Sequence, residues 1–235
     1  MKKMTMMQHF AELRRRMLWT FVVFLFAFVF GWYTSPFVQD FLSAPLMDVW
    51  QNGAMLYSGL SDGFMIRMSL AFLVAIVITI PVALWHIWAF VTPGLKPKER
   101  KFIFLILILS PVLFLIGAGF AFYVLLPFVF RFFIELNEGA PVQSLMLPIA
   151  RDYLSFSIDL LKVFGIAFQL PLVMVMLNRM GILSRARAIK TRRWAIMIIV
   201  ILAAVVTPPD VVSQILLAIP LWLLFESSIL FMRAE

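Results

Sequence analysis

Six long segments with few or no charged residues dominate this 235-residue sequence and limit what it can fold into. Apolar runs near twenty residues are typical of transmembrane helices. A bilayer offers backbone polar groups no water, and the segments lack the strict alternation of barrel strands, so each is predicted to be a helix. The predicted fold class is an all-α integral membrane protein with six transmembrane helices. The spans are 17–34, 64–92, 102–134, 153–178, 194–206 and 212–232.

The composition agrees with this class. Hydrophobic residues make up 63% of the chain and charged residues 14%, with a mean hydropathy of +1.01, whereas soluble domains are roughly half apolar and a quarter charged. The chain has no cysteine, and its two histidines lie far apart, so neither a disulfide nor a metal cluster is expected. The net charge of +8 can indicate nucleic-acid binding, but membrane topology explains the cations better. No cofactor and no nucleic acid are therefore expected.

Cations gather in every second connection between the predicted spans. If the spans alternate in direction, 16 of the 20 Lys and Arg residues fall on one side. By the positive-inside rule that side is cytoplasmic, so both termini are predicted to lie inside, and 35–63, 135–152 and 207–211 outside. The 16 cations are Lys2, Lys3, Arg14, Arg15, Arg16, Lys96, Lys98, Arg100, Lys101, Arg179, Arg185, Arg187, Lys190, Arg192, Arg193 and Arg233.

Helix lengths and prolines predict bent helices of unequal length. The segment 102–134 would form a helix of about 50 Å, so it must tilt or project beyond a hydrocarbon core of about 30 Å. The segment 194–206 would reach only about 20 Å, and the "TPPD" that follows it forces a hairpin. Prolines inside spans bend helices and fit a curved wall, although membrane helices also simply tolerate proline. They are Pro81, Pro111, Pro127, Pro171 and Pro220.

Motifs of common enzyme sites, such as GxxxxGK(S/T), GxSxG and HExxH, are missing from the sequence, so an enzyme is not expected. Polar residues at membrane depth are functional candidates by default. We interpret Asp159 and Lys162, three residues apart, as a neutralising pair, and Arg67 as a snorkelling residue. His86 fits a hydrogen-bonded helix residue. Glu226, near the inner end of its span, is either interfacial or a buried functional acid.

The N-terminal segment 4–16 is predicted to form an amphipathic helix on the inner membrane surface, because its apolar residues recur at helical spacing. Two readings of Glu12 are open. Glu12 can pair with Arg15 or Arg16 within the helix, which is worth a few tenths of a kcal/mol. Alternatively, Glu12 and Glu99 are isolated acids among cytoplasmic cations that bind guanidinium groups of a ligand in bidentate geometry. Pro97 is predicted to open the third helix, with Glu99 in its first turn.

Five stretches, in order along nearly the whole chain, resemble the TatC family, the receptor component of the bacterial twin-arginine protein translocase. Three of these blocks, "ELRRR", "KERK" and "TPPDxxSQ", form a specific combination. The stretches are "HFAELRRRM" at 9–17, "SAPL" at 43–46, "WAFVTPGLKPKERK" at 88–101, "FGIAFQLPL" at 164–172 and "TPPDVVSQILLAIPLWLLFE" at 207–226.

The resemblance implies a single concave, cup-like membrane domain, 1–235, with short fifth and sixth helices. It implies a receptor in the bacterial inner membrane that binds the Arg-Arg motif of signal peptides on folded cargo. The proton-motive force would drive transport, and small single-span TatA- and TatB-like subunits would be partners. Membrane lipid and further copies of the chain complete the expected partners.

The resemblance also implies site residues. Signal-peptide binding would involve Glu12 and Glu99, with Arg14, Arg16 and Phe90 around them, and motif residues on the outer side would be Pro45, Asp210 and Gln214. Many members of the family have Glu where this chain has Gln169, so a mechanism that needs an ionisable group there cannot apply, although a polar role survives. Gln169 and Glu226 are the intramembrane candidates for transport.

Two other functions are left open by the residues alone. A small secondary transporter or channel could use Asp159, Lys162, Gln169 and Glu226 to line a solute path, although the inverted repeats of such folds are not visible. A purely structural membrane scaffold is the third reading.

Overall fold

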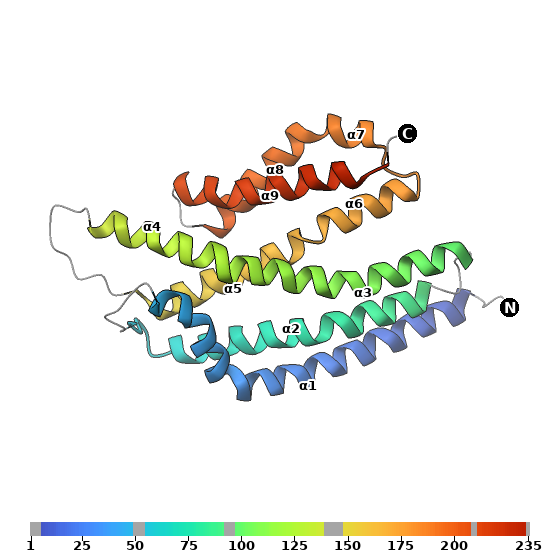
Figure 1. The fold of residues 1–235 in the computed structure, drawn as a ribbon. Coiled ribbons are helices and arrows are strands. Elements are labelled where there is room, and N and C mark those ends of the chain that lie inside the picture. Colours follow the sequence, from blue (N-terminus) through green and yellow to red (C-terminus); the bar gives the residue numbers. More distant parts are fainter. Residues whose placement is uncertain (1–5, 49–54, 92–96, 139–147, 208–210, 234–235) are drawn as a thin grey trace. The chain divides into compact units, whose positions relative to one another are not determined.

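The computed structural model describes residues 6–48, 55–91, 97–138, 148–207 and 211–233. Within these ranges every regular element is a helix, apart from one isolated backbone bridge between Leu56 and Ile149. The predicted all-α fold class is confirmed. The helices are α1 (Met6–Met47), α2 (Asp62–Val91), α3 (Pro97–Phe120), a π-helical turn (Ala121–Leu125), α4 (Leu126–Glu138), α5 (Ala150–Ala167), α6 (Leu170–Arg179), α7 (Arg185–Lys190), α8 (Arg192–Val206) and α9 (Val211–Phe231) (Figure 1).

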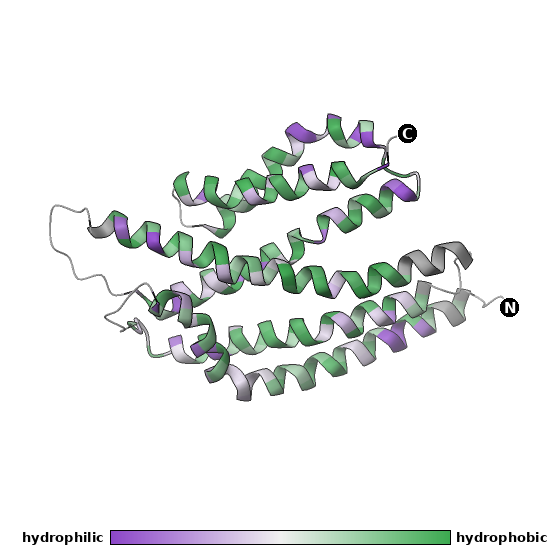
Figure 2. Cartoon of the chain, in the orientation of Figure 1, coloured by the Kyte–Doolittle hydropathy of each residue, from purple (hydrophilic) through white to green (hydrophobic). Residues whose placement is uncertain are grey.

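Five helical stretches of the described chain are long and apolar enough to cross a membrane, and hydrophobic residues predominate along them (Figure 2). The predicted span 194–206 lies in α8, whose 15 residues reach only about 22 Å. The count of six spans therefore stays a prediction. Helix α9, which contains most of the predicted sixth span, has 21 residues and reaches about 31 Å; it is the shortest of the five stretches that are long and apolar enough to cross a membrane in the described chain. The five stretches are Phe10–Met47, Asp62–Phe90, Phe104–Leu136, Ala150–Arg179 and Val211–Phe231.

Helix α1 is one helix of 42 residues, where the sequence predicts an amphipathic helix, a span over 17–34 and then a connection. Pro36 has no amide proton, so the carbonyl of Trp32 loses its usual partner four residues on. The hydroxyl of Ser35, a fully buried residue, donates to this carbonyl at 2.8 Å instead. This bond satisfies the acceptor that the proline leaves without its helical partner.

Residues 1–40 and 63–111 form one compact unit, in which α1 and α2 pack antiparallel. The ring of Phe24 lies 5.3 Å from that of Phe72, edge to face. Gly31 brings the two helices close together, since a Cβ added to it would lie 2.7 Å from the carbonyl oxygen of Ala71. Small residues at a helix contact permit this approach in membranes, where van der Waals packing drives association.

Residues 41–62 and 112–235 form the second unit. Here α3 packs against α5 through two glycines: a Cβ on Gly117 would clash with the backbone carbonyl of Phe164, and one on Gly165 would lie 2.5 Å from the ring of Phe114. Helices α6 and α8 both pack on α9. The hydroxyl of Tyr153 on α5 donates to the carbonyl of Leu42 at 2.7 Å, which ties the end of α1 into this unit.

The fourth predicted span is broken into α5 and α6 at Phe168 and Gln169. Pro171 stands near the start of α6 and cannot donate to the carbonyl of Ala167, where α5 ends. Pro81, Pro111 and Pro220, by contrast, lie inside continuous helices. Of these four prolines, only Pro171 stands at an interruption between two helices.

Candidate functional site

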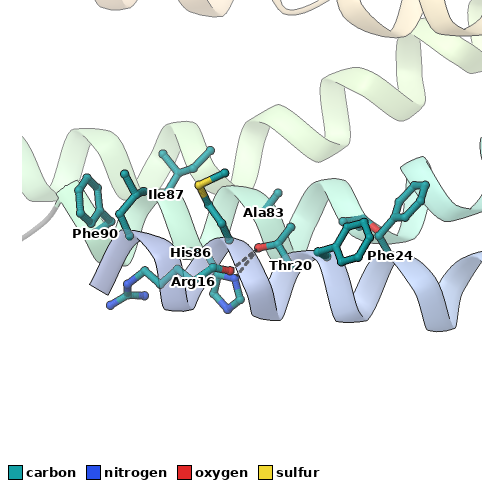
Figure 3. Close-up of a pocket in the computed structure, with 11 residues that line it drawn as sticks. Arg16, Thr20, Phe24, Ala83, His86, Ile87 and Phe90 are labelled. Carbon is teal, nitrogen blue, oxygen red and sulfur yellow. Dashed lines mark hydrogen bonds between the residues drawn. The ribbon is translucent and has the colours of Figure 1, made fainter. Parts of the chain in front are cut away.

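A groove with a volume of about 420 Å³ lies between α1 and α2 in the first unit. Residues of both helices line it at helical spacing (Figure 3). Arg16 and Phe90 lie at one end, and Phe24 lies at the other (Figure 3). We call it the α1–α2 groove; its lining residues are Leu13, Arg16, Met17, Thr20, Phe21, Phe24, Thr79, Ala83, His86, Ile87 and Phe90.

Polar groups in the middle of the groove bond to one another. The Thr20 hydroxyl donates to the carbonyl of Arg16 at 2.9 Å and lies 2.7 Å from Nδ1 of His86. Which of Thr20 and His86 donates in the second contact depends on the tautomer of His86. This contact confirms the interpretation of His86 as a hydrogen-bonded helix residue.

Glu12 and Arg16 form the ion pair that their spacing predicts. Nε of Arg16 donates to Oε1 of Glu12 at 3.0 Å, and Nη2 of Arg16 contacts the same oxygen. The other carboxylate oxygen, Oε2, is buried and has no hydrogen-bond partner among the described residues. A buried carboxylate oxygen without a partner is costly. Among the residues that the structure describes, Oε2 of Glu12 therefore has no donor, and the Arg16 that bonds to Oε1 lines one end of the groove.

Of the other residues predicted for signal-peptide binding, the structure describes the side chain of Arg14 but not that of Glu99. Arg14 lines a second hollow, on a different face of α1 from the α1–α2 groove, together with Arg15 and Trp19. Pro97 opens α3, as predicted, so Glu99 lies in the first turn of that helix. The side chain of Glu99 lies outside what the structure describes. The structure thus brings Glu12, Arg16 and Phe90 to one region and leaves the contact with Glu99 a prediction.

The intramembrane and outer-side candidates belong to the second unit. Glu226 on α9 accepts from Nη2 of Arg192 on α8 at 2.7 Å, so it is an ion-pair partner between two helices. Gln214 donates from Nε2 to the carbonyl of Val200 at 3.0 Å and so also links α8 to α9. Gln169 is half-buried at the break between α5 and α6. Pro45 is buried near the end of α1, and Asp210 lies outside the described residues.

Asp159 and Lys162 form the neutralising pair that was predicted. Nζ of Lys162 donates to Oδ1 of Asp159 at 2.9 Å, and both side chains are exposed. The described residues also hold no cluster of three His, Asp or Glu residues that could bind a metal ion.

Two polar clusters were missed by sequence reasoning. The Asp62 carboxylate is buried and accepts from the amides of Ser58 and Gly59 at 2.9 and 2.8 Å. The buried Asn178 donates to the carbonyl of Leu183 at 3.0 Å and accepts from the amide of Arg233 at 2.9 Å. An Asp at a helix start and an Asn near a helix end are the signals that could have indicated them.

Comparison with known proteins gives the family. The family model of the Sec-independent protein translocase protein (TatC) matches residues 8–220. The TatC protein of Rickettsia prowazekii is 37% identical over 98% of this chain and 93% of its own length. The TatC protein of Escherichia coli is 34% identical over 96% of this chain and 86% of its own length.

Solved structures agree. A crystal structure of the twin-arginine translocase receptor TatC superposes with a TM-score of 0.82 at 30% identity, covering 95% of this chain and 97% of that one. A second, of the same receptor in DDM, gives a TM-score of 0.86 at 29% identity, covering 96% and 99%. The relatives are translocase components, so the function is transport and not enzymatic catalysis. The chain belongs to the TatC family of Sec-independent protein translocase proteins.

Proposed function

We propose that this chain is the receptor subunit of a twin-arginine translocase, which binds the Arg-Arg motif of signal peptides at the cytoplasmic face. Glu12 and Glu99 hold the two arginines, and Arg14, Arg16 and Phe90 surround them. One observation carries the proposal: Glu12 uses one carboxylate oxygen for Arg16 and leaves the other without a described partner. A guanidinium fits such an acceptor, because it forms charge-assisted bonds with carboxylates.

The surrounding cations do not prevent this recognition. At physiological salt, interactions between exposed charges are largely screened beyond about 8 Å. The local geometry around the acid therefore decides whether an arginine binds. Because Oε2 is buried, an arriving arginine has to displace the atoms that cover it; it then bonds to Oε2 while Arg16 keeps Oε1. Phe90, at the Arg16 end of the groove, adds an aromatic ring on which a guanidinium can stack.

The direct test is photocrosslinking of a labelled twin-arginine signal peptide to the purified full-length chain, with a Lys-Lys version as the control. Lysine offers a point charge and cannot reproduce the planar fork of arginine. Preferential crosslinking of the Arg-Arg peptide supports the receptor function. Equal crosslinking of the two peptides would favour a transporter or a scaffold instead.

For the membrane topology we propose six spans with both termini in the cytoplasm, in one concave domain over 1–235. The support is the cation distribution, which puts Arg192 and Arg193 at the start of α8. Helix α8 completes the count as a short span in a hairpin with α9. The proton-motive force drives translocation in this proposal, as the resemblance to the TatC family implies.

Topology gives a prediction. Because the chain has no native cysteine, Ser184→Cys and Asn52→Cys each introduce a single reactive thiol. We expect a membrane-impermeant maleimide added to intact cells to label the Asn52→Cys variant and to spare the Ser184→Cys variant. Permeabilised cells serve as the control, in which both variants are labelled. Labelling of Ser184→Cys from outside intact cells would overturn the arrangement.

The α8–α9 hairpin, with Pro45, Asp210 and Gln214 on the proposed outer side, is the proposed docking edge for small single-span TatA- and TatB-like subunits. Its support is the short length of α8 and the Gln214–Val200 bond that holds the hairpin together. Self-association and contacts with lipid belong to the same proposal.

Gln169 gives a second prediction about transport. At the break between α5 and α6 its amide is proposed to face the interior of the domain and to bond to protein or water. Gln169→Leu removes this polar group, so we expect most of the export of a folded reporter to be lost while binding of the Arg-Arg peptide is retained. Gln169→Glu keeps a polar group of the same shape and should keep export. Full export by Gln169→Leu, or loss of peptide binding, would contradict the separation of the two sites.

A further inference from the structure

We propose that the second hollow on α1 binds an anionic phospholipid of the inner leaflet through its phosphate group. The site goes beyond the receptor function and rests only on the proposed topology, which puts this end of α1 at the cytoplasmic surface. We call it the Arg15 hollow. It has a volume of about 400 Å³ and is lined by Ala11, Arg14, Arg15, Leu18, Trp19 and Val22.

The two arginines of the hollow have no anionic partner in the part of the protein that the structure describes. Both side chains are exposed, and neither forms a hydrogen bond or an ion pair with another described residue. Glu12, the nearest acid on the same helix, bonds to Arg16 instead. Two neighbouring guanidinium groups without a counter-charge match a phosphate, because arginine and phosphate pair in bidentate, charge-assisted geometry.

The lining residues change from cationic to apolar along the helix. Arg14 and Arg15 lie one turn before Leu18 and Trp19 and two turns before Val22, so all five share one face of α1. Hydrophobic turns follow the hydrophilic ones along α1 (Figure 2). A phospholipid carries its charge at the membrane surface and its acyl chains further in, so it matches this order. A soluble acidic peptide matches the arginine end alone.

The depth of the hollow also fits a lipid. From Arg14 to Val22 the helix rises about 12 Å, whereas the interfacial layer of one leaflet is roughly 5 to 7 Å thick. The hollow therefore extends from the level of the head groups into the hydrocarbon region. Trp19 lies between the two ends and is exposed, as is typical of tryptophans in the interfacial aromatic belt.

Lipid titration followed by native mass spectrometry tests the site on the full-length chain, purified and delipidated in detergent. Phosphatidylglycerol, which is anionic, is compared with phosphatidylethanolamine, which has no net charge. We expect the double variant Arg14→Gln/Arg15→Gln to weaken phosphatidylglycerol binding by at least about tenfold, because each cation near the surface attracts anionic lipid. Binding of phosphatidylethanolamine should change far less.

The matched control is Arg187→Gln/Lys190→Gln on α7, which removes two exposed cations from the same proposed side but outside the hollow. This variant should bind phosphatidylglycerol within twofold of wild type. An equal loss in both double variants would mean diffuse attraction by net charge. Wild-type affinity in the Arg14→Gln/Arg15→Gln variant would also overturn the inference, and so would displacement of the lipid by an equal concentration of inorganic phosphate.

A crosslinking measurement covers the case in which the double variant does not fold. The photoreactive residue p-benzoylphenylalanine replaces either Leu18, in the hollow, or Phe26, which is exposed on α1 outside it. In nanodiscs with equal amounts of the two lipids, we expect phosphatidylglycerol adducts to be enriched at position 18 and not at position 26. Arg15→Gln should abolish the enrichment. The same lipid ratio at both positions would contradict a specific site.

These experiments separate the lipid site from the proposed receptor function. Arg14 has a place in both proposals, so peptide binding is not used as a readout, and neither measurement contains a signal peptide. A failure of Arg-Arg recognition would leave the lipid result unchanged. The cysteine-labelling experiment tests the topology independently.

Discussion

Glu12→Gln and Glu99→Gln are each expected to weaken binding of an Arg-Arg signal peptide by about ten- to a hundredfold, because a hydrogen bond to a charged group contributes roughly 1.5 to 3 kcal/mol. Both substitutions keep the shape of the side chain and remove its charge. Binding of a Lys-Lys peptide should change far less. Fluorescence anisotropy with the purified chain measures both affinities, and protein abundance in the membrane should stay the same.

If Glu12 has only a structural role, its substitution should reduce peptide affinity far less. An ion pair four residues apart on a helix, such as Glu12–Arg16, contributes about 0.3 to 0.5 kcal/mol to the helix, so its loss would leave peptide affinity almost unchanged. Because the two acids bind one ligand, the double variant should be less impaired than the sum of the single variants. Asp159→Asn removes a carboxylate that pairs with Lys162 elsewhere and serves as the control. If both single variants bind the peptide within twofold of wild type, Glu12 is only an ion-pair partner of Arg16.

Much of the fold could be predicted because the bilayer leaves helices as nearly the only choice for these apolar runs. The in-helix pairs could be predicted as well. Glu12–Arg16 and Asp159–Lys162 depend on residues three or four apart, and helix geometry alone brings such residues together. These pairs depend only on residues that are close in sequence, so the sequence alone is enough to predict them.

Helix continuity through proline could not be predicted, because membrane helices can either tolerate a proline or bend and break at it. Ser35 donates to the carbonyl that Pro36 orphans, and α1 continues to Met47. Beside Pro171 the chain instead makes a turn at Phe168 and Gln169. The two prolines look alike in sequence, and the structure shows a continuous helix at one and a turn at the other.

The α1–α2 groove was also beyond the sequence. Leu13 and Met17 belong to an apolar stripe that predicts an amphipathic helix, but a stripe does not tell whether it faces lipid or another helix. The facing residues Ala83 and Ile87 come from α2, about seventy positions away. In the sequence, these two residues are part of a long apolar run that does not show which side of the helix faces α1. The half-used carboxylate of Glu12 likewise needs atomic positions to be seen.

Gly117→Leu is expected to cost at least about 3 kcal/mol of folding stability, because added side-chain atoms would enter the backbone carbonyl of Phe164, which cannot move aside. Gly117→Ala should also lower folding stability, by about 1 to 3 kcal/mol, although alanine is a better helix former than glycine. Thermal unfolding in detergent measures both.

Gly119 provides the control within the same helix, since a Cβ there would meet nothing within 4 Å. Gly119→Ala should therefore unfold at the same temperature as wild type or above it, because only the helix-propensity gain of about 1 kcal/mol remains. The comparison separates helix propensity, which both positions share, from contact with α5, which only Gly117 makes. Equal unfolding temperatures for Gly117→Ala and Gly119→Ala would mean that α3 and α5 do not touch at Gly117. In that case the close glycine packing assigned to the second unit would be wrong.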